Sequence, residues 1–418
     1  DRDQEKANHG RGSNLLGVRL YNERLILQVI RREGSLPKAE IARRTGLSAQ
    51  TVSVIINRLL KNRLLYKQPG KRARGRVGQP AIPIALNPDG AFSGGVKIGR
   101  SSLDVMVVNF VGEILQRVNH RYEYPAPDSV FNLIDDEIRS LTSSMSEEQM
   151  QRIVGIGVAA PHELGGWQPL VGVPEQRLQP WNEIDIRERL ARNQSLPVWF
   201  CNDATAACIA EVEFGGQALW DDFLYVFVGT FIGGGVVQNG VLNAGSQDNA
   251  GAIGSMPIPA VYSAETADRE RASAQLINCA SRYLLNRRLR ETGLDPDLAI
   301  EQLQRDDGDA PVEVTRIFDD WLQNTAQAIA VAVTAAVSVI DFKGVVIDGL
   351  LPARQIERLC SSIEQSLDEG NLEGLLRPQI KTGTFGNDAR AIGGAVLPFY
   401  NNFTPNMSVL LKVDDNEA

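Results

Sequence analysis

Cysteine, histidine and aromatic residues are scarce in this chain of 418 residues. It has four cysteines and three histidines, and aromatic residues make up 6% of it. No two cysteines stand in a CxxC spacing, which excludes a disulfide framework and a cysteine-rich zinc cluster. No apolar run approaches the ~20 residues of a membrane span, and the polar start of the chain holds no apolar core of a secretion signal. We therefore expect a cytoplasmic protein with reduced thiols, no bound metal and no membrane partner.

Negative charge is scarce at the start of the chain and abundant in the rest. Residues 1–90 hold 18 Lys and Arg against 7 Asp and Glu, whereas residues 91–418 hold 25 against 44. The formal net charge of -8 therefore combines a basic piece with an acidic one. The hydrophobic fraction of 43% is typical of globular proteins, and the length predicts two or three domains. The basic piece suits a polyanion such as DNA.

The basic piece carries the spacing of a helix-turn-helix. Apolar pairs within residues 25–30 repeat at four residues and predict a helix that Gly34 ends. Pro37 suits the first turn of a second helix. Two helices that meet at a sharp angle need a small residue at the contact, here Ala42, and a residue that tolerates positive φ, here Gly46. The residues that would lock this pair to the first helix are Ile41, Leu47, Val52 and Ile55.

The last helix of this motif is predicted to read DNA. Ser48 is placed to cap it, and the helix runs to about Leu60. Its early outward side chains are small or carry an amide, so they can approach base edges in a major groove. These predicted DNA-contacting residues are Ser48, Ala49, Gln50, Thr51 and Ser53.

A basic loop between two short strands follows. Residues 64–66 and 82–86 predict the strands, and glycines separate the arginines between them. A strand, a flexible basic loop and a strand make a wing, whose arginines can reach phosphates or a narrow minor groove. A solvated loop also fits the charge run alone, and a winged helix that binds protein also fits the three helices, but the helix-turn-helix spacing and the excess of positive charge favour DNA. The predicted wing contacts are Arg72, Arg74, Arg76 and Gln79.

The acidic piece begins behind a turn cluster at Asn87–Gly90 and repeats one strand pattern. In the second copy residues 229–235 form a glycine-rich turn, and Asn239-Gly240 predicts a type I′ hairpin. Each copy precedes helical sequence and a further buried strand. Two such α/β units predict two lobes that face a cleft. The predicted strands are 92–98 and 103–109 in the first copy and 223–228 and 235–238 in the second.

Seven segments carry a family resemblance. In chain order they read VKIGRS, GVAAP, Trp181, NDATAA at 202–207, EVEFGG at 211–216, VGTFIGGG at 228–235 and NAGAIGS at 249–255. From about Leu16 to Tyr400 the chain resembles the ROK family of repressors and sugar kinases, and within it the regulators of the xylose, Mlc and NagC type. The resemblance implies an α/β fold with an N-terminal winged helix-turn-helix and a two-lobed, actin-like body. We expect a DNA-binding domain over residues 1–87, a first lobe over 88–200 rejoined by about 390–413, and a second lobe over 201–389.

The kinases of this family need residues that this chain lacks. The acid and one glycine of their DxGGT phosphate turn fall on Lys97 and Arg100, and a glycine of their second phosphate turn falls on Phe231. Their GEIGH segment reads GAIGS here, from Gly251 to Ser255, and no zinc-binding cysteine cluster follows. The resemblance thus implies neither nucleotide chemistry nor zinc, and we expect no cofactor, no catalytic residue and no enzyme activity.

The predicted effector site keeps part of the family's sugar site. The family's catalytic Asp falls on Asp203, next to Asn202, and in the repressors this pair binds sugar without chemistry. A purely local role stays open, because Asp203 could instead cap the helix that follows. Arg177 could pair with an acidic or phosphorylated ligand and His162 could donate to a hydroxyl, although both also suit an exposed surface. The predicted effector-binding residues are Asn202, Asp203, His162, Glu175, Arg177, Gly251 and Ser255.

These residues together predict a ligand-responsive transcription regulator, most simply a repressor of carbohydrate uptake or catabolism genes. Its partners would be double-stranded operator DNA, a sugar or sugar derivative, and further copies of itself in a homodimer or homotetramer. Two alternatives stay open. One is a ROK-type sugar kinase with an appended DNA-binding head, and the other is a regulator that needs no effector.

Overall fold

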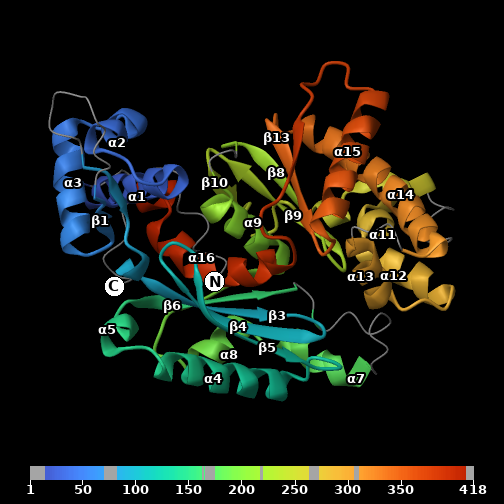
Figure 1. The fold of residues 1–418 in the computed structure, drawn as a ribbon, viewed down its shortest axis with the longest axis horizontal. Coiled ribbons are helices and arrows are strands. Elements are labelled where there is room, and N and C mark those ends of the chain that lie inside the picture. The colour runs from blue at the N-terminus through green and yellow to red at the C-terminus, as the bar shows by residue number, and fades with distance from the viewer. Residues whose placement is uncertain are drawn as a thin grey trace. The chain divides into compact units, whose positions relative to one another are not determined.

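The computed structural model describes residues 15–69, 82–161, 164, 175–216, 220–262, 273–305 and 310–410 (Figure 1). The chain divides into two compact units. Unit 1 comprises Asp1–Phe200 and Gly394–Ala418, and unit 2 comprises Cys201–Gly393. Each unit holds a five-stranded sheet, and unit 1 also carries a helical head, so the predicted α/β fold class is confirmed.

Three helices and a small antiparallel hairpin form the head. They are α1 (Leu15–Glu33), α2 (Lys38–Thr45), α3 (Ala49–Lys61), β1 (Leu65–Lys67) and β2 (Ile84–Leu86). α1 ends just before Gly34, as predicted, whereas Pro37 is the N-cap of α2 and not a residue of its first turn. Apolar side chains of the three helices bury one another and form the core of the head: Ile26, Ile30, Ile41, Val52 and Ile56.

The sheet of unit 1 has the strand order β5-β4-β3-β6-β7. Its strands are β3 (Phe92–Ile98), β4 (Ser102–Asn109), β5 (Ile114–Arg121), β6 (Ile153–Ala160) and β7 (Val198–Asn202). β3, β4 and β5 form an antiparallel meander, and β6 runs parallel to β3. The helices of this part are α4 (Pro127–Ser143), α5 (Glu147–Met150), α7 (Glu175–Leu178) and α8 (Ile186–Ala191). α4 buries its apolar face on β3 and β4.

Glycines let α16 (Ala389–Phe403) lie directly on the sheet of unit 1. A Cβ added to Gly95 would stand 2.4 Å from Ala395, and one added to Gly157 would stand 2.1 Å from the carbonyl oxygen of Gly394. No side chain fits in either gap, so both strands need glycine where the helix crosses them. The buried Ser93 hydroxyl adds a hydrogen bond of 2.6 Å to the carbonyl oxygen of Ala395.

The sheet of unit 2 has the order β10-β9-β8-β13-β14, which repeats the connectivity of unit 1. Its strands are β8 (Phe223–Val228), β9 (Ile232–Gln238), β10 (Val241–Asn243), β13 (Gly344–Gly349) and β14 (Gln379–Thr382). β8 pairs antiparallel with β9 and parallel with β13. At the hairpin from β9 to β10 both Asn239 and Gly240 have positive φ, 53° and 73°, which confirms the predicted type I′ turn.

The glycine-rich turn of unit 2 is shorter than the sequence predicted. Residues 233–235 are not in the turn but in β9, which begins at Ile232. The reason is the helix α9 (Asp203–Phe214), which packs on this strand. A Cβ on Gly233 would lie 2.8 Å from the Cβ of Ala204, and one on Gly235 would lie 2.7 Å from the Sγ of Cys208. The glycines thus serve close packing of helix on strand.

Besides α9, further helices of unit 2 pack beside its sheet (Figure 1). They are α11 (Ile277–Ala280), α12 (Arg282–Glu291), α13 (Pro296–Gln304), α14 (Val312–Val337) and α15 (Ala353–Glu369), with two short paired strands, β11 (Pro257–Pro259) and β12 (Ser273–Gln275). α14 buries Phe318, Trp321 and Ile329 in the core of the unit. Among the helices that the structure describes, none combines the length and the apolar character that crossing a membrane requires.

Candidate nucleic-acid interface and effector site

The recognition helix α3 starts as the sequence predicts. Ser48 is its N-cap, and the Ser48 hydroxyl oxygen accepts a hydrogen bond of 3.1 Å from the backbone N–H of Thr51. The two hydroxyls also lie 2.8 Å apart. Gly46, with φ of 68°, ends α2 and turns the chain into this cap. The start of α3 is therefore fixed by local contacts, and its direction is set by the buried Val52.

The outward face of α3 is exposed at the positions that would meet base edges. Ala49 and Gln50 are exposed, whereas Thr51 and Ser53 are half-buried. Sequence reasoning missed Val54, which follows Gln50 by one helical turn and is 63% exposed. An exposed amide beside an exposed branched methyl pair can read an adenine edge and a thymine methyl. The four-residue spacing between Gln50 and Val54 in the sequence could have identified Val54 as a member of the same helix face.

The arginines of α2 are paired within the head. Glu40 accepts hydrogen bonds of 2.9 Å from Arg43 and 2.8 Å from Arg44, and Arg44 also reaches Glu33 at 2.5 Å. The hydrogen bonds from Arg43 and then Arg44 lower the pKa of Glu40 to about 2. The charge that α2 can offer to phosphates is thereby reduced.

The wing is described only at its base. β1 and β2 pair antiparallel, and Gln68 extends the ladder with a hydrogen bond of 2.9 Å to the carbonyl oxygen of Pro83. The four predicted wing contacts, Arg72, Arg74, Arg76 and Gln79, lie outside the described residues.

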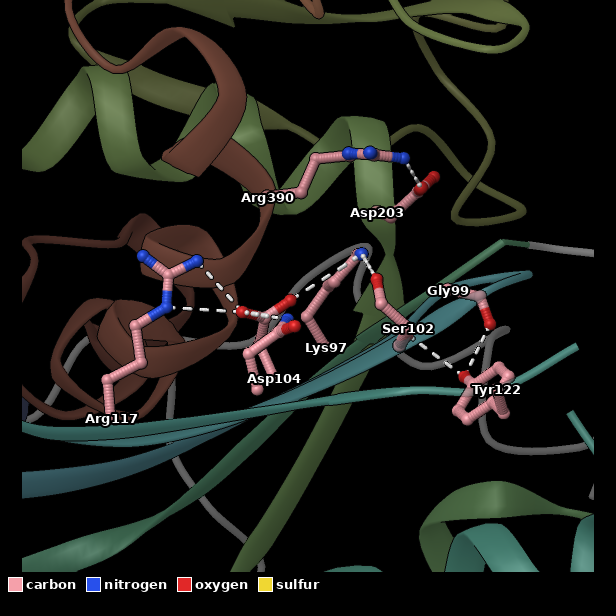
Figure 2. Close-up of polar contacts among 9 residues, drawn as sticks. Lys97, Gly99, Ser102, Asp104, Arg117, Tyr122, Asp203 and Arg390 are labelled. Atoms are coloured by element: carbon pink, nitrogen blue, oxygen red, sulfur yellow. Dashed lines mark hydrogen bonds and ion pairs between the residues drawn. The ribbon is translucent and has the colours of Figure 1, made fainter. Parts of the chain in front are cut away.

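The turn from β3 to β4 in unit 1 is filled by a side chain of its own strand (Figure 2). The Lys97 ammonium donates to the Ser102 hydroxyl at 3.1 Å and stands 3.6 Å from the Asp104 carboxylate. A Cβ on Gly99 would lie 2.7 Å from the Lys97 Nζ, so the ammonium occupies the inside of the turn. Tyr122 closes the turn with hydrogen bonds of 2.6 and 2.9 Å to the carbonyl oxygens of Gly99 and Ser102.

Asp104 is the buried counter-charge of this cluster. Arg117 donates to Asp104 at 2.8 and 3.1 Å, and Asn119 donates at 3.0 Å. Burial acts to raise the pKa of Asp104, but the hydrogen bonds from Arg117 and Asn119 and the charge of Lys97 outweigh it and lower that pKa. The cluster is therefore an internally paired group of charges that holds three strands together.

In unit 2, Asn202 and Asp203 stand at the start of α9. Asn202 is the N-cap and accepts 2.9 Å from the backbone N–H of Ala204. The local interpretation of Asp203 as the cap is thus wrong, because its carboxylate turns to another partner. Arg390 of α16 donates to the Asp203 carboxylate at 2.8 Å, and Figure 2 shows the two side chains pointing toward one another. Each side chain keeps 15% of its surface exposed, so a ligand can reach the pair.

The glycine turn between β8 and β9 is held by the start of α12. Backbone N–H groups of Arg282 and Tyr283 donate to the carbonyl oxygens of Gly229 and Thr230 at 3.1 and 3.0 Å. The ring of Phe231 stacks on the ring of Tyr283, with centroids 5.8 Å apart. An aromatic pair therefore stands where the turn meets α12.

Two buried acids lie deeper in unit 2, and sequence reasoning missed both. Glu211 accepts from the backbone N–H and the hydroxyl of Thr384 at 3.0 and 2.8 Å. Asp348 accepts from the Tyr225 hydroxyl at 3.0 Å. Burial is the main cause that raises the pKa of each carboxyl, and the charge of Asp348 raises the pKa of Glu211 further. The available signal for Glu211 was an acid directly after the apolar run of residues 206–210 in α9.

The other predicted effector residues are spread over the two units. Arg177 in unit 1 is exposed and donates to the Tyr124 hydroxyl at 3.3 Å. Gly251 has φ of 82° and packs against Gly235, whereas Ser255 is exposed. His162 and the side chain of Glu175 lie outside the described residues. The assignment of these residues to one effector site therefore stays a prediction.

Two models of known protein families match this chain. A family model described as ROK family matches residues 93–399, which is most of the chain. The chain belongs to the ROK family. A second model, described as winged helix-turn-helix DNA-binding, matches residues 19–65, the segment that holds α1 to α3.

The relatives of this ROK protein include regulators and kinases. It is 25% identical over 241 residues to the xylose repressor of Bacillus subtilis, which covers 58% of this chain and 61% of that protein. It is 28% identical over 218 residues to an N-acetylmannosamine kinase of Haemophilus influenzae, with 51% of this chain and 67% of the kinase covered. The chain thus spans about three fifths of the xylose repressor that it matches.

Solved ROK structures share the fold. A ROK family transcriptional regulator described as a homolog of the Escherichia coli MLC protein superposes with a TM-score of 0.64 at 18% identity, covering 94% of this chain and 99% of that one. A ROK family glucokinase from Streptomyces griseus, in complex with glucose and AMPPNP, gives a TM-score of 0.56 at 19% identity, covering 73% and 99%. At 18% and 19% sequence identity, the similarity to these two structures shows the fold alone.

The residues present in this ROK chain do not fit a magnesium-bound nucleotide. A phosphate turn needs backbone N–H groups open to the phosphate and an acid for the metal. Here the Lys97 ammonium fills the first turn, and the second turn carries Phe231, whose ring stacks on that of Tyr283. The Asp203 carboxylate is paired with Arg390.

Proposed function

We propose that this ROK protein is a ligand-responsive transcription regulator, most simply a repressor of carbohydrate uptake or catabolism genes. The winged helix-turn-helix would bind operator DNA, and the ROK body would bind a sugar or sugar derivative. The observation that carries this proposal is α3, a helix capped by Ser48 that presents Gln50 and Val54 outward from a basic head. The xylose repressor and the MLC homolog are regulators by name, which supports it.

The same proposal includes how the protein assembles and where it acts. A homodimer or homotetramer would present two heads to half-sites related by symmetry and set whole helical turns apart. A protein that regulates genes by binding operator DNA would act in the cytoplasm. The effector would act by binding more tightly to one of two states of the protein that differ in DNA affinity.

A sugar kinase with a DNA-binding head is the second candidate, because kinases are among the relatives and Asp203 is retained. We propose that the chain is not an enzyme. Lys97 and Phe231 at the two phosphate turns support this, and so does the Arg390 partner of Asp203, since a paired carboxylate is a poor general base. Phosphorylation of any sugar by ATP that Asp203→Ala abolishes would contradict it.

The test of DNA reading is Gln50→Ala. Duplexes selected from a random library by the full-length protein give the preferred site, and fluorescence anisotropy gives the affinity for that site and for each single-base variant. We expect Gln50→Ala to lose about 1–3 kcal/mol of discrimination at one base position and little elsewhere. The matched control is Gln327→Ala, which removes an exposed glutamine from α14. Unchanged base preference in Gln50→Ala would remove α3 from the interface.

A further inference from the structure

Two partly buried arginines of unit 2 contact the end of β8 and the turn that follows it. The Arg390 guanidinium carbon lies 5.2 Å from the centroid of the Phe227 ring. Arg282 begins α12 at the turn after the same strand, where its backbone N–H donates to the carbonyl oxygen of Gly229. The Phe227 ring also lies at Gly229, since a Cβ added there would stand 3.1 Å from a ring carbon. The two arginines come from α16 and α12, more than 100 residues apart in the chain.

These guanidiniums have more N–H donors than hydrogen-bond partners. A guanidinium carries five N–H donors. Within the described part of the chain Arg390 donates to Asp203, and its Nε is buried with no hydrogen-bond partner. Arg282 donates to the carbonyl oxygen of Leu350 at 3.0 Å, and its Nε is likewise buried with no partner among the described residues. Buried donors without acceptors destabilise a protein unless a ligand completes them.

The counter-charge of Arg282 is weaker than that of Arg390. Asp203 pairs with Arg390, whereas Arg282 pairs with Asp297 at 3.6 Å, and the Asp297 side chain is 95% exposed. An exposed carboxylate at that distance is screened by water and compensates little. Burial lowers the pKa of Arg282, and the charge of Arg390 lowers it further, as two neighbouring cations require. The side chains of Arg282 and Arg390 keep 16% and 15% of their surfaces exposed.

We propose that the effector of this protein carries an oxyanion group, a carboxylate or a phosphate, which Arg390 and Arg282 bind while Asp203 receives hydrogen bonds from its hydroxyls. Planar guanidiniums match both oxyanions, and each new hydrogen bond would join two charged groups. Arg390 would then be shared between Asp203 and the ligand. This inference rests on the proposed function in one respect, that the ROK body binds a polyhydroxylated effector.

The experiment is isothermal titration calorimetry on the full-length protein without DNA. The ligands are two matched sets, glucose with glucuronate and glucose 6-phosphate, and xylose with xylonate and xylose 5-phosphate. We expect an anionic member to bind at least tenfold more tightly than its neutral parent, and the acid and phosphate arms identify the oxyanion. Arg390→Gln should weaken binding of that ligand by about tenfold or more and binding of the neutral parent by less than threefold.

Two further variants separate a binding role from a structural one. Arg358→Gln is the matched control, because Arg358 also donates to an aspartate, Asp319, at 2.7 Å and also lies over a ring, that of Phe318 at 5.6 Å. It should leave every affinity unchanged. Asp203→Asn releases Arg390 from its partner, so inorganic phosphate should bind more tightly while neutral sugars bind more weakly. A loss of packing alone would not move these two affinities in opposite directions.

The outcomes distinguish this proposal from the function on which it rests. Neutral sugars that bind as tightly as both of their anionic derivatives would overturn the oxyanion proposal and leave the sugar-binding regulator standing. Equal losses for neutral and anionic ligands in Arg390→Gln would do the same. No binding by any ligand, with operator binding intact, would overturn both this proposal and the effector half of the proposed function.

Discussion

At the scale of single residues, unit 2 buries the carboxyls of Glu211 and Asp348. Glu211 and Asp348 are each 1% exposed, and they accept hydrogen bonds from hydroxyls and backbone N–H groups. Neutral donors stabilise a carboxylate less than an arginine does, so burial prevails and the pKa of each carboxyl is raised. Asp104 in unit 1 shows the opposite result, since Arg117 and Lys97 face it and its pKa is lowered.

Glu211→Gln should make stability less dependent on pH. The folded-state pKa of Glu211 lies above its ordinary value of 4.5, so the folded protein keeps a proton that the unfolded chain releases. The stability that this group supports therefore falls as pH rises from 4.5 to the raised pKa, by about 1.4 kcal/mol for each unit of the shift. Glutamine never ionises, and it can accept from the Thr384 N–H and donate to the Thr384 hydroxyl.

Urea unfolding from about pH 4.5 upward measures this effect. The difference in unfolding free energy between Glu211→Gln and the natural protein should grow in favour of the variant as pH rises. Glu188→Gln is the control, because the Glu188 side chain is 70% exposed on α8. Parallel pH curves for Glu211→Gln and the natural protein would show that Glu211 keeps its ordinary ionisation.

At the scale of elements, the recognition helix depends on a single hydroxyl at its start. Ser48 supplies the hydrogen bond to the Thr51 N–H, and no acidic residue stands in the first turn of α3. The neighbouring helix α2 ends at Gly46, so the two helices meet through a turn of three residues. The cap therefore holds Ala49 and Gln50, the first two residues of α3, in helical conformation.

Ser48→Ala should fray α3 and weaken DNA binding. Loss of a serine cap costs about 1 kcal/mol, which corresponds to roughly a fivefold increase in local opening. Amide hydrogen exchange of the first turn of α3 should become faster by about that factor, and operator affinity should fall by a similar one. Ser146→Ala is the control, since Ser146 caps α5 of the body through Gln149 in the same way. It should speed exchange at α5 and leave operator affinity unchanged; equal affinities in all three proteins would separate the cap from DNA binding.

The sequence allowed local features to be predicted and long-range ones not. The Ser48 cap, the Gly46 turn and the Asn239-Gly240 hairpin were correct because each depends on neighbouring residues. The boundary of β9 was wrong because α9 lies on glycines 233–235, a contact between segments distant in sequence. The pairing of Asp203 with Arg390 spans 187 positions, and nothing local to either residue indicates it.

At the scale of the whole molecule, charge is divided between a basic head and an acidic body. Residues 1–90 have an excess of 11 positive charges and residues 91–418 an excess of 19 negative ones. Head and first sheet belong to one compact unit, and several contacts join them. Arg63 pairs with Glu148, Arg24 donates to the carbonyl oxygen of Thr404 at 3.2 Å, and Arg31 lies over the ring of Phe110. The acidic body should repel DNA and so confine binding to the head.

Arg76→Ala should lower the salt dependence of DNA binding without changing sequence preference. Each phosphate contact releases counterions and contributes about -0.9 to the slope of log affinity against log salt, so one lost contact should reduce the slope by about 1. Affinity should fall alike for the preferred site and for unrelated DNA, because phosphates carry no base identity. Arg139→Ala is the matched control, since Arg139 is 74% exposed on α4 of the body. Anisotropy titrations from about 50 to 200 mM salt test this, and an unchanged slope for Arg76→Ala would exclude the predicted wing contact.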